Sequence, residues 1–434
     1  MTLLARRTVF LGAIAATSAV SAQVSQGCIS ELSGQECGPR LNTITTAVPF
    51  LLIGPDSRSG GMGDAGVALP ADANALHWNP SKIAFAENDM EFRVSVSPWL
   101  RNLVPDMSLA YISGYKKLDK NSALGGSLRY FNLGSITFTD INGQVLRDFK
   151  PAEFAFDVSY AQKFSERTSG GITLRYVNSN LTGGLNVSGA NTKAGQAIAA
   201  DLSFFYTNDQ MTVGNRDATF SFGIDVSNIG NKMSYSETSR TDFLPINLRL
   251  GPAFTVDLDP YNSITFNADV NKLLVPTPPV YKIEESANGN PQYVMEDGNY
   301  VVFSGEDPDR GVASGIFGSF SDAPGNVYVD EAGVQHVESG SQMREELREF
   351  YYGGGLEYWY AKQFAFRTGY FWEAATKGDR KYFTMGLGVK YSMFSLDFSY
   401  LIANTTRSPL ANTLRFTLGF NFDGKNRKPT ESGQ

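Results

Sequence analysis

The chain contains two histidines, and neither stands in a pattern that supports catalysis. A serine triad or a zinc site would have to be built around one of them. His77 lies beside Trp78 in a glycine-rich segment, where a packed, hydrogen-bonded imidazole is the ordinary outcome. His336 lies in a polar stretch that has no second ligand at useful spacing. We therefore predict no catalytic residue, no metal and no cofactor, and we do not expect an enzyme.

Two further motifs could bind a nucleotide or an ion. The run Gly60-Gly61-Met62-Gly63-Asp64 resembles a phosphate-binding glycine loop, but such a loop needs a preceding buried strand and a following helix, and neither is predicted here. The acids Glu306, Asp307 and Asp309 could attract calcium, although the EF-hand spacing is absent. We interpret the first motif as tight turns and the second as a solvated acidic loop.

The elements that position these residues are expected to be β-strands. Apolar and polar residues alternate along many segments, and this period of two puts successive side chains on opposite faces of a sheet. Many of the segments reach about 9–11 residues, the length that a tilted strand needs to cross a bilayer. No run approaches the roughly 20 apolar residues of a membrane-spanning helix. An even number of strands favours a closed, antiparallel, all-β transmembrane barrel. We predict fourteen strands: 90–98, 106–117, 121–133, 151–164, 167–179, 196–207, 217–230, 244–256, 262–273, 346–360, 363–373, 381–392, 394–404 and 411–422.

The lengths of the connections predict the orientation of the barrel. Short connections, such as 118–120 and 165–166, alternate with long ones, of which the longest covers 274–345. Barrels of the bacterial outer membrane have short periplasmic turns and longer external loops. This parity places residues 274–345 outside the cell, and it places the start of the first strand and the N-terminal segment 23–52 on the periplasmic side.

A segment in front of the first strand, residues 53–89, is predicted to plug the barrel lumen as a hatch. It holds too many Gly, Pro, Asp and Asn residues for a regular helix or strand, yet it carries spaced apolar residues that need burial. Its turns fall at Gly60, Gly61, Gly63, Trp78, Asn79 and Pro80.

The charges that alternation turns toward the lumen are balanced. A charge-selective pore is usually lined by one dominant sign, whereas a filled lumen needs paired charges because unpaired buried ones are costly. We favour a structural network that clamps the plug over a conducting path for ions. The acids are Glu153, Asp157, Asp201, Asp225, Asp269 and Asp397, and the bases are Arg129, Arg175, Arg249, Arg367, Lys390 and Arg415.

The two ends of the chain have their own signatures. Residues 1–22 have the charged start, apolar centre and small-residue cleavage site of a secretory signal peptide. Cys28 and Cys37 are the only cysteines, and in an oxidising compartment we expect them to form a disulfide, with a lipid anchor on Cys28 as the alternative. Residues 423–434 are expected to form a loose, polar tail.

Charge also bears on the partners. The net charge of −7 and the lack of a basic stripe argue against nucleic acid. In the first external loop, Trp99, Leu100 and Leu103 are apolar enough for a contact with a partner protein. Anchoring in the lipid headgroup zone is the equally open alternative.

Several motifs resemble a known family. Asp72-Ala73-Asn74 followed by Asn79-Pro80-Ser81 is similar to the N-terminal motif of FadL-like barrels. Val48-Pro49-Phe50-Leu51, the run from Pro55 to Asp64, and Trp78-Asn79-Pro80-Ser81-Lys82 more specifically resemble the PorV family. That family is the FadL-like outer-membrane component of the type IX secretion system of Bacteroidetes. The resemblance extends through Leu128–Gly134, Pro151–Asp157 and Asn271–Pro279.

The resemblance implies a function that composition does not show. It implies an outer-membrane protein that binds secreted cargo with a C-terminal β-sandwich signal domain, associates with the large translocon barrel, and passes the cargo to surface attachment machinery. A FadL-like channel for fatty acids or other hydrophobic molecules is the alternative. The family has also been linked to lipopolysaccharide deacylation, for which the residues offer no Ser-His-Asp arrangement.

Overall fold

The computed structural model describes residues 41–422 except 102, 105, 140, 141, 143, 185, 188, 189, 237–240, 286–290, 331, 406 and 407. The predicted signal peptide, the predicted disulfide between Cys28 and Cys37, and the polar tail therefore lie outside the described residues.

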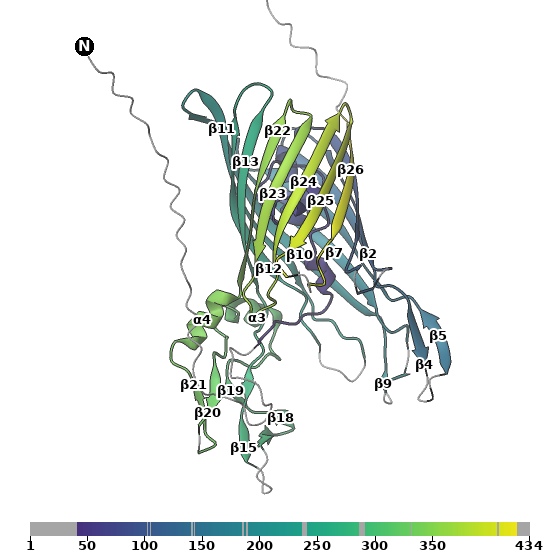
Figure 1. The fold of residues 1–434 in the computed structure, drawn as a ribbon, viewed down its shortest axis with the longest axis vertical. Coiled ribbons are helices and arrows are strands. Elements are labelled where there is room, and N and C mark those ends of the chain that lie inside the picture. Colours follow the sequence, from purple (N-terminus) through teal and green to yellow (C-terminus); the bar gives the residue numbers. More distant parts are fainter. Residues whose placement is uncertain are drawn as a thin grey trace, which may run out of the picture. The chain divides into compact units, whose positions relative to one another are not determined.

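A single closed antiparallel barrel of fourteen strands forms the body of the protein (Figure 1). Each strand pairs with the next along the wall, and β1 pairs with β26 to close the ring. This confirms the predicted fold class. In order around the wall, the strands are β1 (Met90–Pro98), β2 (Ser108–Lys117), β3 (Ser122–Asn132), β6 (Ala152–Lys163), β7 (Thr168–Asn180), β10 (Gly195–Val213), β11 (Arg216–Gly230), β12 (Asn247–Asp257), β13 (Ser263–Leu273), β22 (Phe350–Tyr360), β23 (Phe364–Trp372), β24 (Lys381–Tyr391), β25 (Phe394–Ala403) and β26 (Leu414–Phe422).

Alternation in the sequence becomes alternation of burial along the strands. In β24 and β26, buried positions alternate with exposed ones almost without interruption. The main differences from the predicted bounds lie at strand ends. The strand β10 runs six residues past the predicted end at 207, to Val213, so the β10–β11 hairpin is the longest of the barrel. The predicted strand 346–360 begins only at Phe350, because Ser341–Arg348 forms the helix α4.

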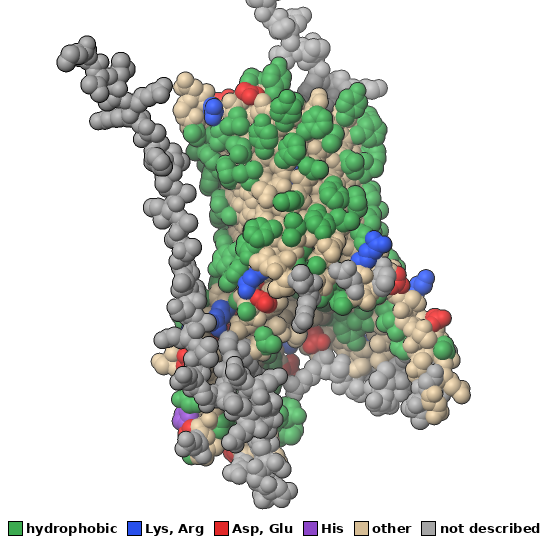
Figure 2. All heavy atoms as spheres, viewed as in Figure 1, with side chains coloured by type: hydrophobic (Ala, Val, Ile, Leu, Met, Phe, Trp, Pro, Cys, Tyr) green, Lys and Arg blue, Asp and Glu red, His purple; other side chains and the backbone are tan. Residues whose placement is uncertain are grey.

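The outer face of the barrel is apolar. Figure 2 shows hydrophobic side chains covering the visible wall, with charged side chains gathered near the two ends of the barrel. A backbone that crosses lipid must satisfy its polar groups internally, and a closed barrel with an apolar exterior meets this requirement. Exposed wall residues include Phe92, Val94, Val96, Leu128, Phe156, Leu174, Leu202, Phe266, Phe366, Phe383, Met385, Leu387, Leu396, Phe416 and Leu418.

The long connections gather at one end of the barrel and carry small elements of their own. Two short hairpins stand in the second and third of these connections: β4 (Ile136–Thr139) with β5 (Val145–Phe149), and β8 (Asn186–Val187) with β9 (Ala190–Asn191). The connection between β13 and β22, residues 274–349, is the largest, and we call it the large loop. It contains the helices α3 (Val312–Gly318) and α4, together with the short strands β14 (Val280–Tyr281), β15 (Ile283–Glu285), β16 (Pro291–Tyr293), β17 (Met295–Glu296), β18 (Asn299–Tyr300), β19 (Val302–Ser304), β20 (Val327–Val329) and β21 (Gln335–Val337). Within the described part of the chain, no helix is long and apolar enough to cross a membrane.

The structure places the segment 53–85 inside the barrel (Figure 1), and hydrogen bonds join this segment to strands of the wall. It contains only short helical turns: α1 (Ser57–Gly60), α2 (Ala75–Trp78) and η2 (Pro80–Phe85). We call residues 53–89 the plug. Its charges and backbone groups are bonded to strands on several sides of the barrel.

Glycines in the wall let the plug backbone come close. A Cβ on Gly369 would lie 2.2 Å from the amide nitrogen of Gly63, and a Cβ on Gly355 would lie 2.6 Å from Cα of Met62. The plug glycine Gly63 has a φ of +73°, a conformation that residues with a side chain rarely adopt. The plug backbone can therefore approach these wall positions so closely because they are glycines without a Cβ atom.

Residues 41–52, which we call the strap, lie at the end of the barrel that carries the long connections. The backbone amide of Asn42 donates to the carbonyl of Thr376, and that of Ala47 donates to the carbonyl of Phe243. The start of β1 lies at the opposite end, among the short turns. For residues 41–52, the predicted periplasmic location and the predicted external location of the long connections therefore cannot both be correct. The two predictions conflict because connection parity orients only the strands, whereas the segment before β1 runs back through the lumen.

Candidate functional site

A cavity of about 820 Å³, which we call the mouth cavity, lies at the end of the barrel with the long connections. The strap, the plug, the barrel wall and the loops all contribute to its lining. Apolar contributions come from Ile44, Leu52, Ile53, Trp99, Leu100, Leu103, Phe371, Leu401 and Leu410, and charged ones from Asp64, Arg249, Glu349, Glu373, Lys377, Asp379, Arg380 and Arg415.

The three residues predicted as a partner contact, Trp99, Leu100 and Leu103, all line the mouth cavity. They belong to the turn between β1 and β2, where the amide of Leu103 donates to the carbonyl of Leu100 at 2.8 Å. Trp99 and Leu100 are partly buried against the apolar cluster that holds the strap, whereas Leu103 is 63 % exposed. The loop therefore presents an apolar edge to the mouth cavity.

The floor of the mouth cavity is formed by the plug and is tied to the wall by charge. The Asp64 carboxylate accepts hydrogen bonds from Arg415 and, at 2.6 Å, from the hydroxyl of Tyr382. The indole of Trp78 donates to the carboxylate of Asp56 at 2.6 Å. Each acid in this floor thus has a donor, and the plug presents a fixed surface to the cavity.

A second cavity of about 650 Å³ lies on the other side of the plug, toward the short turns. It is lined by plug residues such as Arg58, Asp72 and Phe85 and by wall residues such as Lys390 and Asp397. The two cavities share no lining residue. The plug therefore separates a mouth on the side of the long connections from a charged vestibule on the opposite side.

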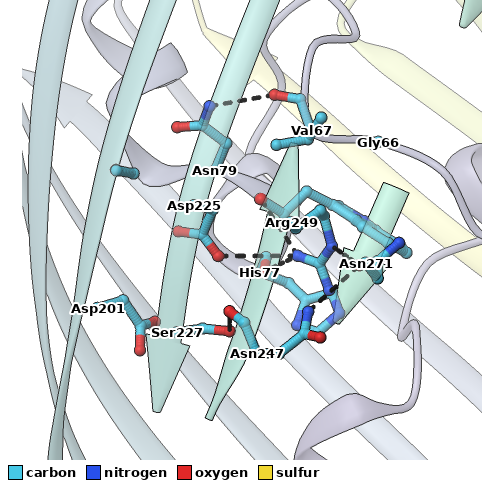
Figure 3. Close-up of polar contacts among 12 residues, drawn as sticks. Gly66, Val67, His77, Asn79, Asp201, Asp225, Ser227, Asn247, Arg249 and Asn271 are labelled. Atoms are coloured by element: carbon cyan, nitrogen blue, oxygen red, sulfur yellow. Dashed lines mark hydrogen bonds and ion pairs between the residues drawn. The ribbon is translucent and has the colours of Figure 1, made fainter. Parts of the chain in front are cut away.

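Four of the predicted lumen charges bind the plug or the strap directly, and three of them are arginines. Arg129 donates to the carbonyl of Leu51 at 2.7 Å and to Nδ1 of His77 at 2.6 Å. Figure 3 shows Arg249 against the carbonyl of His77, to which it donates at 3.2 Å. The third is Arg415, on Asp64. These arginines donate hydrogen bonds to carbonyl groups of the strap and the plug and to the Asp64 carboxylate. Burial would otherwise leave these groups unpaired.

Other predicted lumen charges bind each other across the wall. Arg175 lies between Asp157, at 2.7 Å, and Asp201, at 2.9 Å. Asp397 accepts from Arg367 at 2.7 Å. These ion pairs join strands of the wall to one another.

Glu153 and Asp225 make no hydrogen bond to a described cation. Glu153 accepts from the hydroxyl of Ser179 at 2.6 Å and has no ion pair among the described residues. The Asp225 carboxylate lies 3.8 Å from Arg249, and neither of its oxygens accepts a hydrogen bond from a described group (Figure 3). Among the described residues, neither acid makes a hydrogen bond or an ion pair with the plug, so no direct contact supports the prediction that these two acids clamp the plug.

Sequence reasoning missed several plug charges. Arg58 binds Glu357 at 2.8 Å and Asp72 at 3.2 Å, and Lys82 donates to the carbonyl of Gly66 at 2.5 Å. Asp269, which alternation did place in the lumen, accepts from the amides of both Gly66 and Val67 (2.7 and 3.0 Å). These charges could have been found from the sequence, because they are charged residues in a segment that was otherwise predicted to be apolar and buried.

The large loop holds the one group of carboxylates in the described chain with oxygens close enough to share a cation: Asp322, Glu346 and Glu349. The ammonium of Lys272 already lies 2.5 Å from Glu349 and 3.4 Å from Glu346. Lys377 adds a second ammonium 3.0 Å from Glu349. Burial raises the pKa of Asp322 to about 6. The arrangement is thus a set of ion pairs that ties the large loop to the barrel rim.

The two histidines lie far apart in the sequence and in different settings. His77 is buried in the lumen, with its ring against Trp78. His336 is paired with Asp330 at 2.8 Å in the large loop and stacks on Tyr328.

A closed barrel of fourteen antiparallel strands with an apolar exterior is an outer-membrane protein. The family model described as type IX secretion system protein PorV matches residues 37–280, more than half of the chain. The chain belongs to the PorV family, as its motifs predicted. Comparison with curated proteins gave no match.

Solved barrel structures are similar to this one at low sequence identity. The toluene transporter TbuX of Ralstonia pickettii is 11 % identical with a TM-score of 0.43, and the match covers 86 % of this chain and 100 % of that one. The monoaromatic hydrocarbon channel CymD is 14 % identical with a TM-score of 0.44, covering 86 % and 99 %. A FadL homologue of Pseudomonas aeruginosa is 10 % identical with a TM-score of 0.38, covering 88 % and 99 %.

Proposed function

We propose that this PorV-family barrel is a non-enzymatic docking protein of type IX secretion. It receives cargo with a C-terminal β-sandwich signal domain at its mouth cavity and passes it from the large translocon barrel to the surface attachment machinery. The observation that carries the proposal is the pairing of an apolar mouth with a filled lumen. Trp99, Leu100 and Leu103 line the mouth, and the plug lies behind it.

The filled lumen favours docking over conduction. Ion pairs join the plug to the wall through Arg58 and Arg415, and the wall glycines leave no space for added atoms at Gly369. A folded signal domain cannot enter such a lumen, so a protein cargo would have to stay at the mouth. Aromatic and aliphatic residues that a partner can cover supply most of the binding energy in such contacts.

A triple variant tests the docking proposal. Replacement of Trp99, Leu100 and Leu103 by alanine removes the apolar edge of the loop, and we expect the affinity of the purified protein for an isolated signal domain to fall about tenfold or more, about 1.4 kcal/mol. The same variant in cells should retain cargo that wild-type cells release. The matched control is L118A/F164A, which removes two exposed apolar side chains at the opposite end of the barrel. Equal loss in both variants, or in neither, would contradict a specific role for the mouth.

The alternative is a FadL-like channel for a hydrophobic small molecule. The observation that favours it is the apolar part of the mouth cavity, where Ile53, Phe371 and Leu401 lie close to the arginines of the floor. Deletion of the gene distinguishes the two functions. Retained secretion of signal-bearing proteins, together with lost uptake of a long-chain fatty acid, would support the channel and refute docking.

A further inference from the structure

The strap begins among the long connections. The side chain of Asn42 is buried and donates to a carboxylate oxygen of Glu345 at 2.9 Å and to the carbonyl of Pro278 at 3.1 Å. Both partners belong to the large loop, and the Asn42 amide binds Thr376 in the connection between β23 and β24. Leu41, next to it, is 73 % exposed. The described chain therefore starts at the outer edge of the mouth.

The middle of the strap is packed into the barrel wall from the mouth side. Val48, Phe50 and Leu51 are almost fully buried in one apolar cluster with Met107, Leu109 and Phe131 of the wall and first loop. The Phe50 and Phe131 rings stack with centroids 6.1 Å apart. This packing and the Arg129 bond to the Leu51 carbonyl fix the strap in its place.

The plug leaves the lumen at the other end. Phe85 lines the cavity on the side of the short turns, and the carbonyl of Asp89 accepts from the amide of Lys117 at 2.8 Å, beside the turn between β2 and β3. The chain thus enters at one mouth of the barrel and leaves at the other. The plug is held at both ends: by the strap at the long-connection mouth and by β1 at the short-turn end.

From this path we infer that Leu41 stands on the outer surface of the cell, and that the plug is a through-running segment that cannot swing out of the barrel like a door hinged at one end. The inference rests on the proposed outer-membrane role in one respect, the external orientation of the long connections. It adds the location of Leu41 and the strap, on the side opposite to the one predicted for the segment 23–52.

Cysteine labelling tests the inference in whole cells. In the full-length chain with Cys28 and Cys37 replaced by serine, single cysteines are placed as L41C, A332C in the large loop, or K120C in a short turn, all at exposed positions. Intact cells are treated with a membrane-impermeant maleimide, and permeabilised cells give the total. Heat-modifiable migration verifies that each barrel is folded, and T43C, also exposed, repeats the test if L41C does not fold.

We expect L41C and A332C to be labelled in intact cells and K120C only after permeabilisation. Labelling of A332C without L41C would refute the inference while the orientation of the barrel stands. Labelling of K120C alone would refute the surface location and the proposed orientation together. The two failures are therefore distinguishable.

Discussion

Arg415 joins the plug to the wall through a buried ion pair with Asp64. The attraction within such a pair adds little net stability to the fold, because both charges lose their hydration on burial. Loss of one partner is different, because it leaves an uncompensated charge in a medium that solvates it poorly. The register of the plug in the lumen is set by contacts of this kind.

Replacing Asp64 by alanine should therefore destabilise the folded protein strongly. We expect the free energy of unfolding to fall by about 3–5 kcal/mol, because Arg415 is left buried without its partner. Thermal or denaturant unfolding in detergent micelles measures it. In the control, K282A breaks an exposed ion pair with Glu284 in the large loop and should cost about 1 kcal/mol or less. The double variant D64A/R415M should recover part of the loss, and its failure to do so would refute the electrostatic explanation.

Asp322 should make the stability of the large loop depend on pH. Its pKa is raised to about 6, mainly because burial disfavours the carboxylate. A carboxyl group whose pKa is higher in the folded state stabilises the fold at pH values below its ordinary pKa of 3.8, and this contribution is lost as the pH rises through about 6. We expect the loop to be digested more readily by a protease at pH 7 than at pH 4.5.

The variant D322N identifies the source of this dependence. Asparagine does not titrate, so the digestion rate should change less between pH 4 and 6, once the protease's own pH profile is subtracted. The control is D307N, at an exposed position in the same loop, which should keep the wild-type dependence. An unchanged pH profile in D322N would exclude Asp322 as the titrating group.

At the scale of elements, the plug depends on glycines in the strands that surround it. An alanine at Gly369 would place its Cβ 2.2 Å from the Gly63 nitrogen, so the plug backbone would have to move. We expect G369A to loosen the plug and make the outer membrane permeable to a large antibiotic such as vancomycin. The control is G126A, at a strand position where the nearest atom to the added Cβ is 3.5 Å away. Equal permeability of the two variants would show that the plug does not rely on the close approach.

The strands were predictable because lipid imposes one rule along the whole wall. Every lipid-facing position must be apolar, so residues such as Phe416 and Leu418 mark their strand without help from distant parts of the chain. The large loop follows no such rule. Its helix α4 replaced the start of the predicted strand 346–360, and the apolar residues Met343 and Leu347 of this helix are exposed.

The site was predictable only in part. Trp99, Leu100 and Leu103 stood out because apolar residues in an external loop are unusual, and the alternation of the strands assigned the inward charges. The partners of those charges could not be assigned. Asp64 and Arg415 are 351 positions apart, and local sequence holds no information about which strand the plug faces. The same limit hid the path of the strap.

At the scale of the whole molecule, the plug divides the lumen into two cavities without a shared lining residue. We expect the intact protein to show no stable ion conductance in a planar lipid bilayer. Removal of residues 57–85 should open a conducting pore, because this segment separates the two cavities. Heat-modifiable migration shows whether the shortened chain still forms a barrel. Steady conductance from the intact protein, equal to that of the shortened one, would contradict a closed lumen.

The threaded path also imposes an order of events on assembly. The ring closes where β1 meets β26, the last strand among the described residues. Ser57 in the plug binds Thr417 in that strand, 360 positions away. Contacts between residues so far apart form slowly, because a long loop of chain must first be closed. The segment before β1 runs through the finished ring and contacts its last-formed seam, so we expect it to lie between the open edges before the two strands join. Biogenesis of this barrel would then be a wrapping reaction, in which the wall folds around a chain already laid across its interior.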